Sequence, residues 1–178
     1  MKKSILSKLF WVFWCSTTIL TGILAGYMVS HSIMLGRFFS WLVASGNMDL
    51  LRQTFTVFRE VSKPDPNVLY DIPLYLAFVS GVIWTVLAFI LKRDRIIALI
   101  AGLSTFWVGN IFAISDLDEA EEAVLSGVAD ERMAQFFLSI NVPIHTLFAV
   151  IYVVSLFLLL FVALKGQWSK AYSTEAGL

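Results

Sequence analysis

The two histidines of this chain, His31 and His145, both lie inside long apolar segments of the sequence. Ionisable side chains are costly within a membrane segment and mark candidate functional sites there. Asn141 precedes His145 by one helical turn, so these two side chains share a helix face. A histidine can act as a general base near neutral pH, and an asparagine amide can donate to a developing oxyanion. The three residues are therefore predicted to form a catalytic group.

Together these residue types suit the removal of a proton from an activated carbon beside a carbonyl group, with stabilisation of the enolate that results. Three further residues, Tyr75, Trp107 and Asn110, are predicted to bind the substrate. Tyr75 is near the start of the second apolar segment and Asn110 near the end of the third, so we expect both at a depth similar to that of the histidines. All four segments would then contribute a polar group to one outward-facing pocket.

Pro143 lies between Asn141 and His145 and removes one backbone donor from the last helix. The carbonyl of Ser139 loses its partner, which is typical of a bend in the helix. Such breaks persist in a membrane where neighbouring groups satisfy the backbone. We therefore expect a kink that widens the outer cavity.

Two other interpretations of the polar residues remain open. The chain could be a haem- or quinone-binding electron-transfer subunit, in which His31 and His145 are axial ligands of a haem or belong to a copper site. A difference in depth between the two histidines would count against haem. His145 and Asn141 could instead form only hydrogen bonds between helices. The sequence has no HxxxH or ExxH pair, and two histidines make a poor transition-metal shell. No metal site is predicted and no cofactor is favoured.

Four uncharged apolar segments must position these residues, and they span about 9–36, 72–91, 96–115 and 135–164. A helix of about 20 apolar residues crosses a hydrocarbon core roughly 30 Å thick. Hydrophobic residues make up 58% of the chain and charged residues 15%, against about 45–50% and 25% in soluble domains. The mean hydropathy is +0.80. The sequence thus predicts an all-α fold, a four-transmembrane-helix bundle, formed by one integral membrane domain over residues 1–178.

The net charge of zero conceals an asymmetry between the ends of these segments. If the N-terminus is cytoplasmic and four helices alternate, eight basic residues lie inside and five outside, as the positive-inside rule requires. The inside group comprises Lys2, Lys3, Lys8, Lys92, Arg93, Arg95, Lys165 and Lys170, and the outside group comprises Arg37, Arg52, Arg59, Lys63 and Arg132. We therefore predict a multi-pass protein of the inner (plasma) membrane with both termini in the cytoplasm.

Two loops, 37–71 and 116–134, then face outward, and each is predicted to carry a short amphipathic helix. In the first loop, apolar residues recur at helical spacing from Leu50 to Val61, after Asn47 or Asp49 as a cap. The second begins with Ser115 and an acidic cluster that includes Asp116 and Glu122. These carboxylates lack the alternating spacing and glycine turn of a calcium loop, so they are interpreted as a solvated helix face.

Composition also limits the partners and the chemistry. Cys15 is the only cysteine, so an intrachain disulfide and a thiolate zinc site are excluded. The sequence has no nucleotide-binding glycine loop, and no nucleic-acid partner is expected. Membrane lipid is the expected surrounding, an apolar small molecule the expected substrate, and association of identical chains is left open.

Two short stretches carry a resemblance to a known family. Residues 25–34, AGYMVSHSIM, resemble the glycine-containing first helix of anthrone-oxygenase-like membrane proteins, and residues 141–145, NVPIH, are similar to the Asn-Val-Pro-x-Asn motif that opens their last helix. The layout is also similar, with four helices and a long outer loop after the first. The resemblance implies a four-helix membrane bundle and, as in some fungal members, cofactor-free oxidation of anthrones to anthraquinones. It carries over Asn141, whereas His145 replaces the second asparagine.

Overall fold

The structure is a computed structural model that describes residues 2–61 and 66–175, and this part of the chain contains helices joined by turns, without strands. The predicted all-α class is confirmed. The helices in order are α1 (Lys2–Ser30), the π-helical turn η1 (His31–Leu35), α2 (Gly36–Ala44), α3 (Met48–Val61), α4 (Pro66–Ile90), α5 (Arg95–Ile97), the π-helical turn η2 (Ala98–Gly102), α6 (Ser104–Ala113), α7 (Leu117–Ser126) and α8 (Glu131–Glu175).

Three helical stretches of the described chain are long and apolar enough to cross a membrane: Lys3–Ala44, Asp71–Ile90 and Glu131–Gly166. The third predicted segment is broken at Leu103, where Arg95–Gly102 and Ser104–Ala113 meet at an angle of 40°. If this bent pair counts as one span, the number of spans is four. The described part of the chain therefore has three to four helical stretches that are long and apolar enough to cross a membrane.

The helix bounds differ from the sequence expectation at several ends. The first helix does not stop at residue 36, because the turn at η1 passes directly into α2 with αR backbone angles on both sides. The helix α4 begins at Pro66 rather than near residue 72, since proline is tolerated in the first turn of a helix. The last helix passes through Pro143 without interruption from Glu131 to Glu175.

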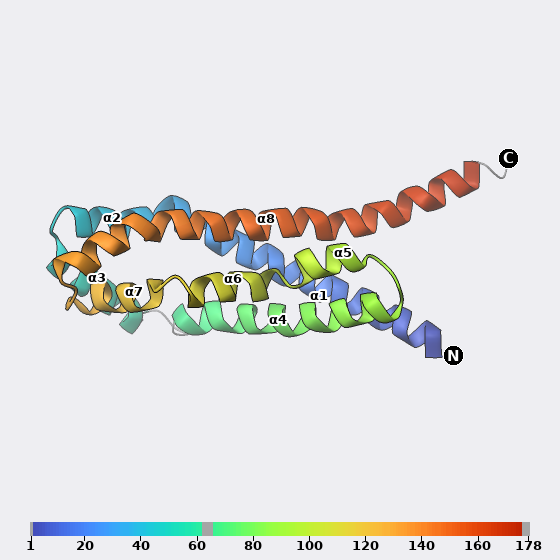
Figure 1. Cartoon of the computed structure of the whole chain (residues 1–178), viewed down its shortest axis with the longest axis horizontal. Helices are drawn as coiled ribbons and strands as arrows, with labels where there is room; N and C mark the ends of the chain where they lie inside the picture. The colour runs from blue at the N-terminus through green and yellow to red at the C-terminus, as the bar shows by residue number, and fades with distance from the viewer. Residues whose placement is uncertain (1, 62–65, 176–178) are drawn as a thin grey trace.

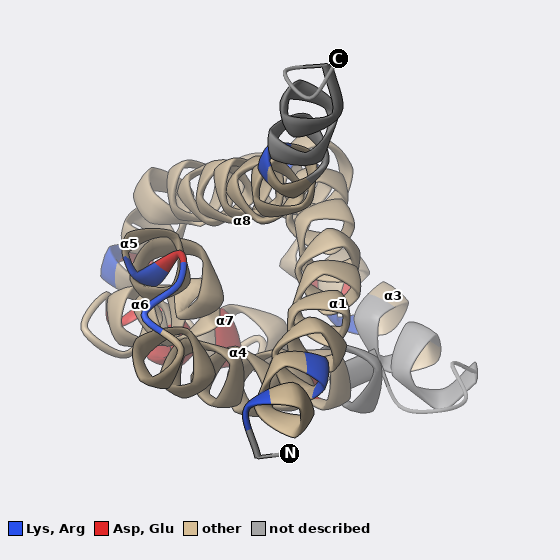
Figure 2. Cartoon of the chain, turned by 90° about the vertical axis from the view of Figure 1, so that its right-hand side faces the viewer, with Lys and Arg blue, Asp and Glu red and all other residues tan. Residues whose placement is uncertain are grey.

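The long helices lie alongside one another, and α1 contacts both α4 and α8 (Figures 1 and 2). The start of α1 and the end of α8 lie at the same end of the bundle, whereas α3 and α7 lie at the opposite end (Figure 1). Both predicted amphipathic helices exist, as α3 and α7. Leu51 of α3 is fully buried, and Leu50 is about half exposed. The side chains of Phe55, Phe58 and Val61 lie outside those described.

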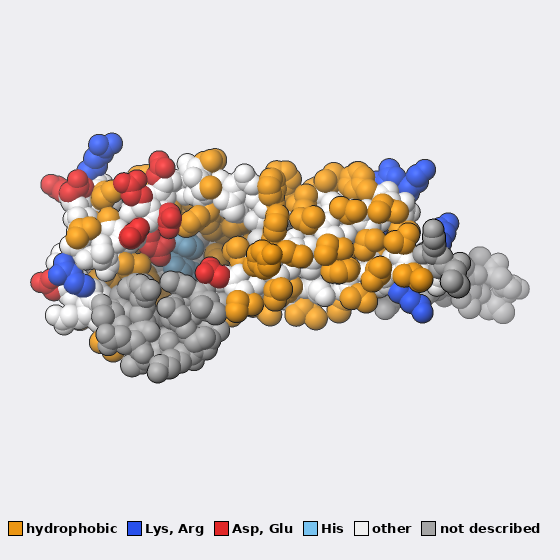
Figure 3. All heavy atoms as spheres, turned by 90° about the horizontal axis from the view of Figure 1, so that it is seen from below, with side chains coloured by type: hydrophobic (Ala, Val, Ile, Leu, Met, Phe, Trp, Pro, Cys, Tyr) orange, Lys and Arg blue, Asp and Glu red, His pale blue; other side chains and the backbone are white. Residues whose placement is uncertain are grey.

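The surface of the bundle is apolar along its middle and charged at its ends (Figure 3). Large hydrophobic side chains such as Ile19, Val86 and Phe157 are more than half exposed there. In water this would leave an extensive apolar surface, but in a bilayer these side chains meet hydrocarbon. The exposed apolar band therefore fits a chain that lies in a membrane.

Two hydrophobic clusters fill the interior at different depths. One contains Leu24, Phe148 and Tyr152, and the other contains Phe10, Trp84 and Leu159, nearer the end where both termini lie. The interior also contains buried side chains with hydroxyl groups, among them Thr17 and Ser80. The core is thus layered along the bundle axis.

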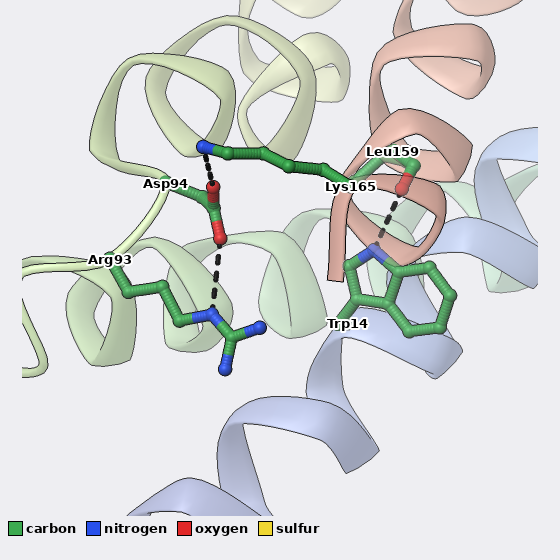
Figure 4. Close-up of polar contacts among 5 residues, drawn as sticks. All are labelled: Trp14, Arg93, Asp94, Leu159 and Lys165. Carbon is green, nitrogen blue, oxygen red and sulfur yellow. Dashed lines mark hydrogen bonds and ion pairs between the residues drawn. The ribbon is translucent and has the colours of Figure 1, made fainter. Parts of the chain in front are cut away.

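A turn between α4 and α5 closes the end of the bundle near the termini. Asp94 has a φ of 49° and is nearly buried, with an exposed side-chain fraction of 7%. Its carboxylate accepts hydrogen bonds from Arg93 Nε at 3.2 Å and from Lys165 Nζ at 3.5 Å (Figure 4). Beside it, the indole of Trp14 donates to the carbonyl of Leu159 at 3.0 Å. These contacts fix α8 to the turn and to α1.

Candidate functional site: a stacked histidine pair

The π-helical turn at His31–Leu35 brings His31 to the inner side of the first helix. A π-turn contains one residue more than an α-turn, so it rotates the residues that follow it relative to those before, and such turns are frequent at functional sites. Gly36 leaves room for the imidazole, since a Cβ atom there would lie 3.0 Å from His31 Cδ2 and 3.1 Å from the His31 carbonyl oxygen. The π-turn and the absence of a side chain at Gly36 therefore both determine where the His31 ring lies.

The rings of His31 and His145 are stacked, with centroids 3.7 Å apart and an interplanar angle of 21°. Phe148, one turn further along α8, meets the His145 ring edge to face at a centroid distance of 6.0 Å. Two positive charges at the distance of the stack would repel strongly at low dielectric constant. The geometry therefore fits a pair in which at most one ring is charged.

Asn141 supports His145 through its backbone. Its carbonyl oxygen lies 2.8 Å from His145 Nδ1. Because a carbonyl oxygen only accepts, Nδ1 of His145 must carry the hydrogen in this bond. In the neutral ring, Nε2 of His145 then bears the lone pair that accepts a proton.

The amide nitrogen of Asn141 is fully engaged in contacts with the first helical stretch. It donates to the carbonyl of Gly36 at 3.1 Å and to Ser40 Oγ at 3.1 Å, and an amide NH₂ has two hydrogens to donate. In this conformation neither hydrogen is free for an oxyanion. The side chain of Asn141 therefore holds α8 against α2, and its backbone carbonyl orients the His145 imidazole.

The histidine pair lies near the surface of one end of the bundle. His145 is buried, with an exposed fraction of 7%, whereas His31 is half-buried. Nε2 of His31 is itself buried and has no hydrogen-bond partner among the described residues. Figure 3 shows a histidine side chain in a depression bordered by acidic side chains.

The stack does not have the geometry of a haem site. Axial histidines point a ring nitrogen at the iron from opposite sides, whereas these rings lie face to face at the same depth. Among the described residues, no group of three or more His, Cys, Asp or Glu side chains could hold a metal ion. The observed arrangement therefore fits proton transfer better than metal ligation.

The three predicted substrate-binding residues lie elsewhere. Tyr75 and Asn110 line an apolar groove of about 360 Å³ between α4 and α6, and none of His31, Asn141 and His145 lines it. The amide of Asn110 donates within its own helix, to the carbonyl of Phe106 at 2.7 Å. Trp107 is 45% exposed, and its indole donates to the carbonyl of Leu99 across the helix break at 3.2 Å. The structure thus gathers the predicted catalytic residues but separates them from this group.

The site also includes Gly36, Ser40 and Phe148, which sequence reasoning did not select. Ser40 and Phe148 are ordinary residues for apolar helices, and nothing in their spacing marks them. A close contact at Gly36 could have been predicted, because glycine often permits close approach of a neighbouring group. That the neighbouring group is the His31 ring depends on the π-turn. Comparison of the chain with models of protein families, with curated proteins and with solved structures found no match.

Proposed function

We propose that this chain is a multi-pass protein of the plasma membrane with four spans and both termini in the cytoplasm. The distribution of basic residues supports this orientation. The start of α1 and the end of α8 lie at one end of the bundle, as an even number of spans requires. The histidine pair then lies toward the outer side.

We further propose that His145 acts as a general base on an apolar carbon acid that reaches the site from the membrane. The observation that carries this proposal is the 2.8 Å bond between His145 Nδ1 and the Asn141 carbonyl. This bond fixes the tautomer and leaves Nε2 as the basic atom. His31 stacks on the ring and offers a second nitrogen without a partner.

The reaction class that suits such a base is the cofactor-free oxidation of an enolisable aromatic ketone. The base removes one proton from a ring CH₂ group and leaves an enolate. The enolate then gives its electrons to dioxygen, and a new C–O bond forms. Loss of water leaves one oxygen atom as the new carbonyl, so CH₂ and O₂ become C=O and H₂O.

Proton abstraction can be measured without the oxygen step. Purified protein in detergent is incubated with anthrone in D₂O under nitrogen, and the loss of the CH₂ signal is followed by NMR. We expect the wild-type protein to accelerate this exchange over buffer, and His145→Gln to lose most of the acceleration. Asn110→Leu is the matched control and should retain it. No acceleration by the folded wild-type protein would refute the proposal.

A second candidate function is a non-catalytic membrane subunit in which these residues join helices. The two bonds of the Asn141 amide across α8 and α2 favour it. On this alternative, His145→Gln lowers the thermal midpoint of unfolding while the exchange rate equals that of buffer for every variant. The same samples therefore distinguish the two functions.

A further inference from the structure

Beyond the histidine pair, the bundle has a second polar region deep in its interior. Six buried side chains with hydroxyl groups come from four different helices. This hydroxyl layer comprises Thr17, Thr21, Ser80, Thr105, Tyr152 and Ser155. Each of these residues is at most 7% exposed.

Several contacts join the helices that carry these residues. Thr17 Oγ1 lies 3.3 Å from Ser80 Oγ, which links α1 and α4. The helices α6 and α8, which carry Thr105 and Tyr152, also contact each other. A Cβ atom on Gly22, the residue after Thr21, would lie 3.8 Å from Leu156 Cδ1, so α1 and α8 meet at the same height.

The third helical stretch is broken beside this layer. Leu103 separates η2 from α6, directly before Ser104 and Thr105. The backbone of α4 approaches closely there, because a Cβ atom on Gly81 would collide with the carbonyl oxygen of Gly102. Irregular backbone at membrane depth occurs where it is buried in protein or lines a hydrated cavity.

Two hydroxyl groups of the layer lack partners. Thr21 Oγ1 and Tyr152 Oη are buried and make no hydrogen bond with any described residue, and their residues are 1% and 0% exposed. Burying an unpaired hydroxyl group is unfavourable, and buried polar groups are normally satisfied by protein or by ordered water. By contrast, Thr17 donates to the carbonyl of Phe13 as well as lying against Ser80.

The uncharged surroundings of the layer limit the kind of molecule that it can bind. None of the four apolar segments contains an Asp, Glu, Lys or Arg residue, so a cation or an anion in the layer would have no counter-charge. An unpaired ion near the middle of a bilayer is expensive. A small neutral molecule that both donates and accepts hydrogen bonds avoids this penalty.

We infer that the hydroxyl layer binds water within the membrane, with Thr21 and Tyr152 as its direct ligands. A buried water typically makes about three hydrogen bonds to otherwise unpaired groups, and the layer offers hydroxyl groups from four helices. Leu24 lies about one helical turn nearer the histidine pair than Thr21 on α1, and Phe148 about one turn nearer than Tyr152 on α8. The water site is therefore distinct from the proposed catalytic site and does not depend on its activity.

Deleting single hydroxyl groups tests this inference. Both variants keep the approximate side-chain shape: Thr21→Val replaces the hydroxyl group with a methyl group, and Tyr152→Phe removes the hydroxyl group. If water occupies the layer, both variants lose hydrogen bonds and their thermal midpoints in detergent fall by roughly 2–4 °C. If the layer is dry, each variant removes an unpaired polar group, and the midpoint rises. Thr18→Val is the control, since Thr18 bonds the carbonyl of Trp14 in its own helix at 2.8 Å.

A direct measurement tests for water in the layer even if a thermal midpoint does not change or a variant does not fold. Water-edited solid-state NMR of the wild-type protein in lipid transfers magnetisation from water to nearby side chains. We expect transfer to the Thr21 methyl group and the Tyr152 ring, and none to Leu24, which is equally buried and apolar. Equal, background transfer to all three residues would overturn the inference, as would a rise in midpoint for both variants.

Discussion

His31 and His145 stack face to face across the first and last long helices, with ring centroids 3.7 Å apart. The contact depends on the π-turn that presents His31 and on the absence of a side chain at Gly36. Asn141 holds the two helices together at the same height, through bonds to Gly36 and Ser40. The stack is therefore a consequence of three separate local features.

Replacement of Asn141 tests the helix contact beneath the stack. Asn141→Leu keeps the approximate size but loses both hydrogen bonds to α2. We expect the free energy of unfolding to fall by about 0.6–1.7 kcal/mol, the range for hydrogen bonds between membrane helices, as measured by reversible unfolding in mixed detergent. Asn110→Leu should change it little, because that amide bonds its own helix. Equal losses in both variants would contradict the assignment.

Gly36→Ala should separate the two imidazoles. The new Cβ atom would lie 3.0 Å from His31 Cδ2 and 3.3 Å from Nε2, so the His31 ring must move away from His145. The ring-current shift that His31 imposes on the His145 protons should decrease in the NMR spectrum. Gly26→Ala is the control, since nothing lies within 4 Å of a Cβ atom there. An unchanged His145 spectrum in Gly36→Ala would show that the ring accommodates the methyl group.

Gly81→Ala should destabilise the bundle at the broken helix. A Cβ atom at Gly81 would overlap the carbonyl oxygen of Gly102, and rigid backbone cannot yield as a side chain can. Overpacking of this kind costs about 1–3 kcal/mol, which a thermal midpoint in detergent would detect. Gly109→Ala has open space and should be neutral or stabilising, since alanine favours a helix. A neutral Gly81→Ala would require the two helices to separate locally.

Stability should depend on pH through Glu121, a half-buried residue of α7. Burial raises the pKa of its carboxyl group above the ordinary value of 4.5, and the nearby charge of Asp118 raises it further. The folded chain then binds this proton more tightly than the unfolded chain does, so stability falls as pH rises from 4.5 through the raised pKa. Glu121→Gln should remove this dependence and raise the thermal midpoint at pH 7.

The exposed neighbour Glu122 provides the control for that measurement. Glu122→Gln should leave the pH dependence of the wild-type midpoint in place. A pH profile that is the same in Glu121→Gln and the wild-type protein would refute the role of Glu121.

The contacts of Asp94 predict that substitutions of Asp94 and of Lys165 lower the thermal midpoint by different amounts. Asp94→Asn weakens the interactions with Arg93 and Lys165 but tolerates the positive φ. Lys165→Met removes one partner that is 63% exposed, and an exposed pair contributes at most about 1 kcal/mol. We therefore expect Asp94→Asn to lower the thermal midpoint more than Lys165→Met, with a difference that shrinks at high salt. Equal effects would contradict this.

Much of the fold could be predicted from residue type alone. Transfer of an apolar side chain into hydrocarbon is favourable at each position separately, so a run such as 72–91 marks a membrane helix without knowledge of its neighbours. The helices of the loops were also predictable, because the spacing of apolar residues in α3 reports one buried face, to which Leu51 belongs. The break at Leu103 and the extension of the first helix through α2 were not, since they depend on packing against α4 and α8.

For the candidate site, the sequence by itself determined that His31, His145 and Asn141 lie in apolar helices, and that Asn141 and His145 share a face one turn apart. Only the tertiary structure decided that His31 meets His145, while Asn110 and Tyr75 lie in a separate groove. The physical reason is that hydropathy fixes which segments enter the membrane, whereas the rotation and height of each helix are set by close packing between helices. A single π-turn changes that rotation, and the apolar pattern around His31 does not predict this turn.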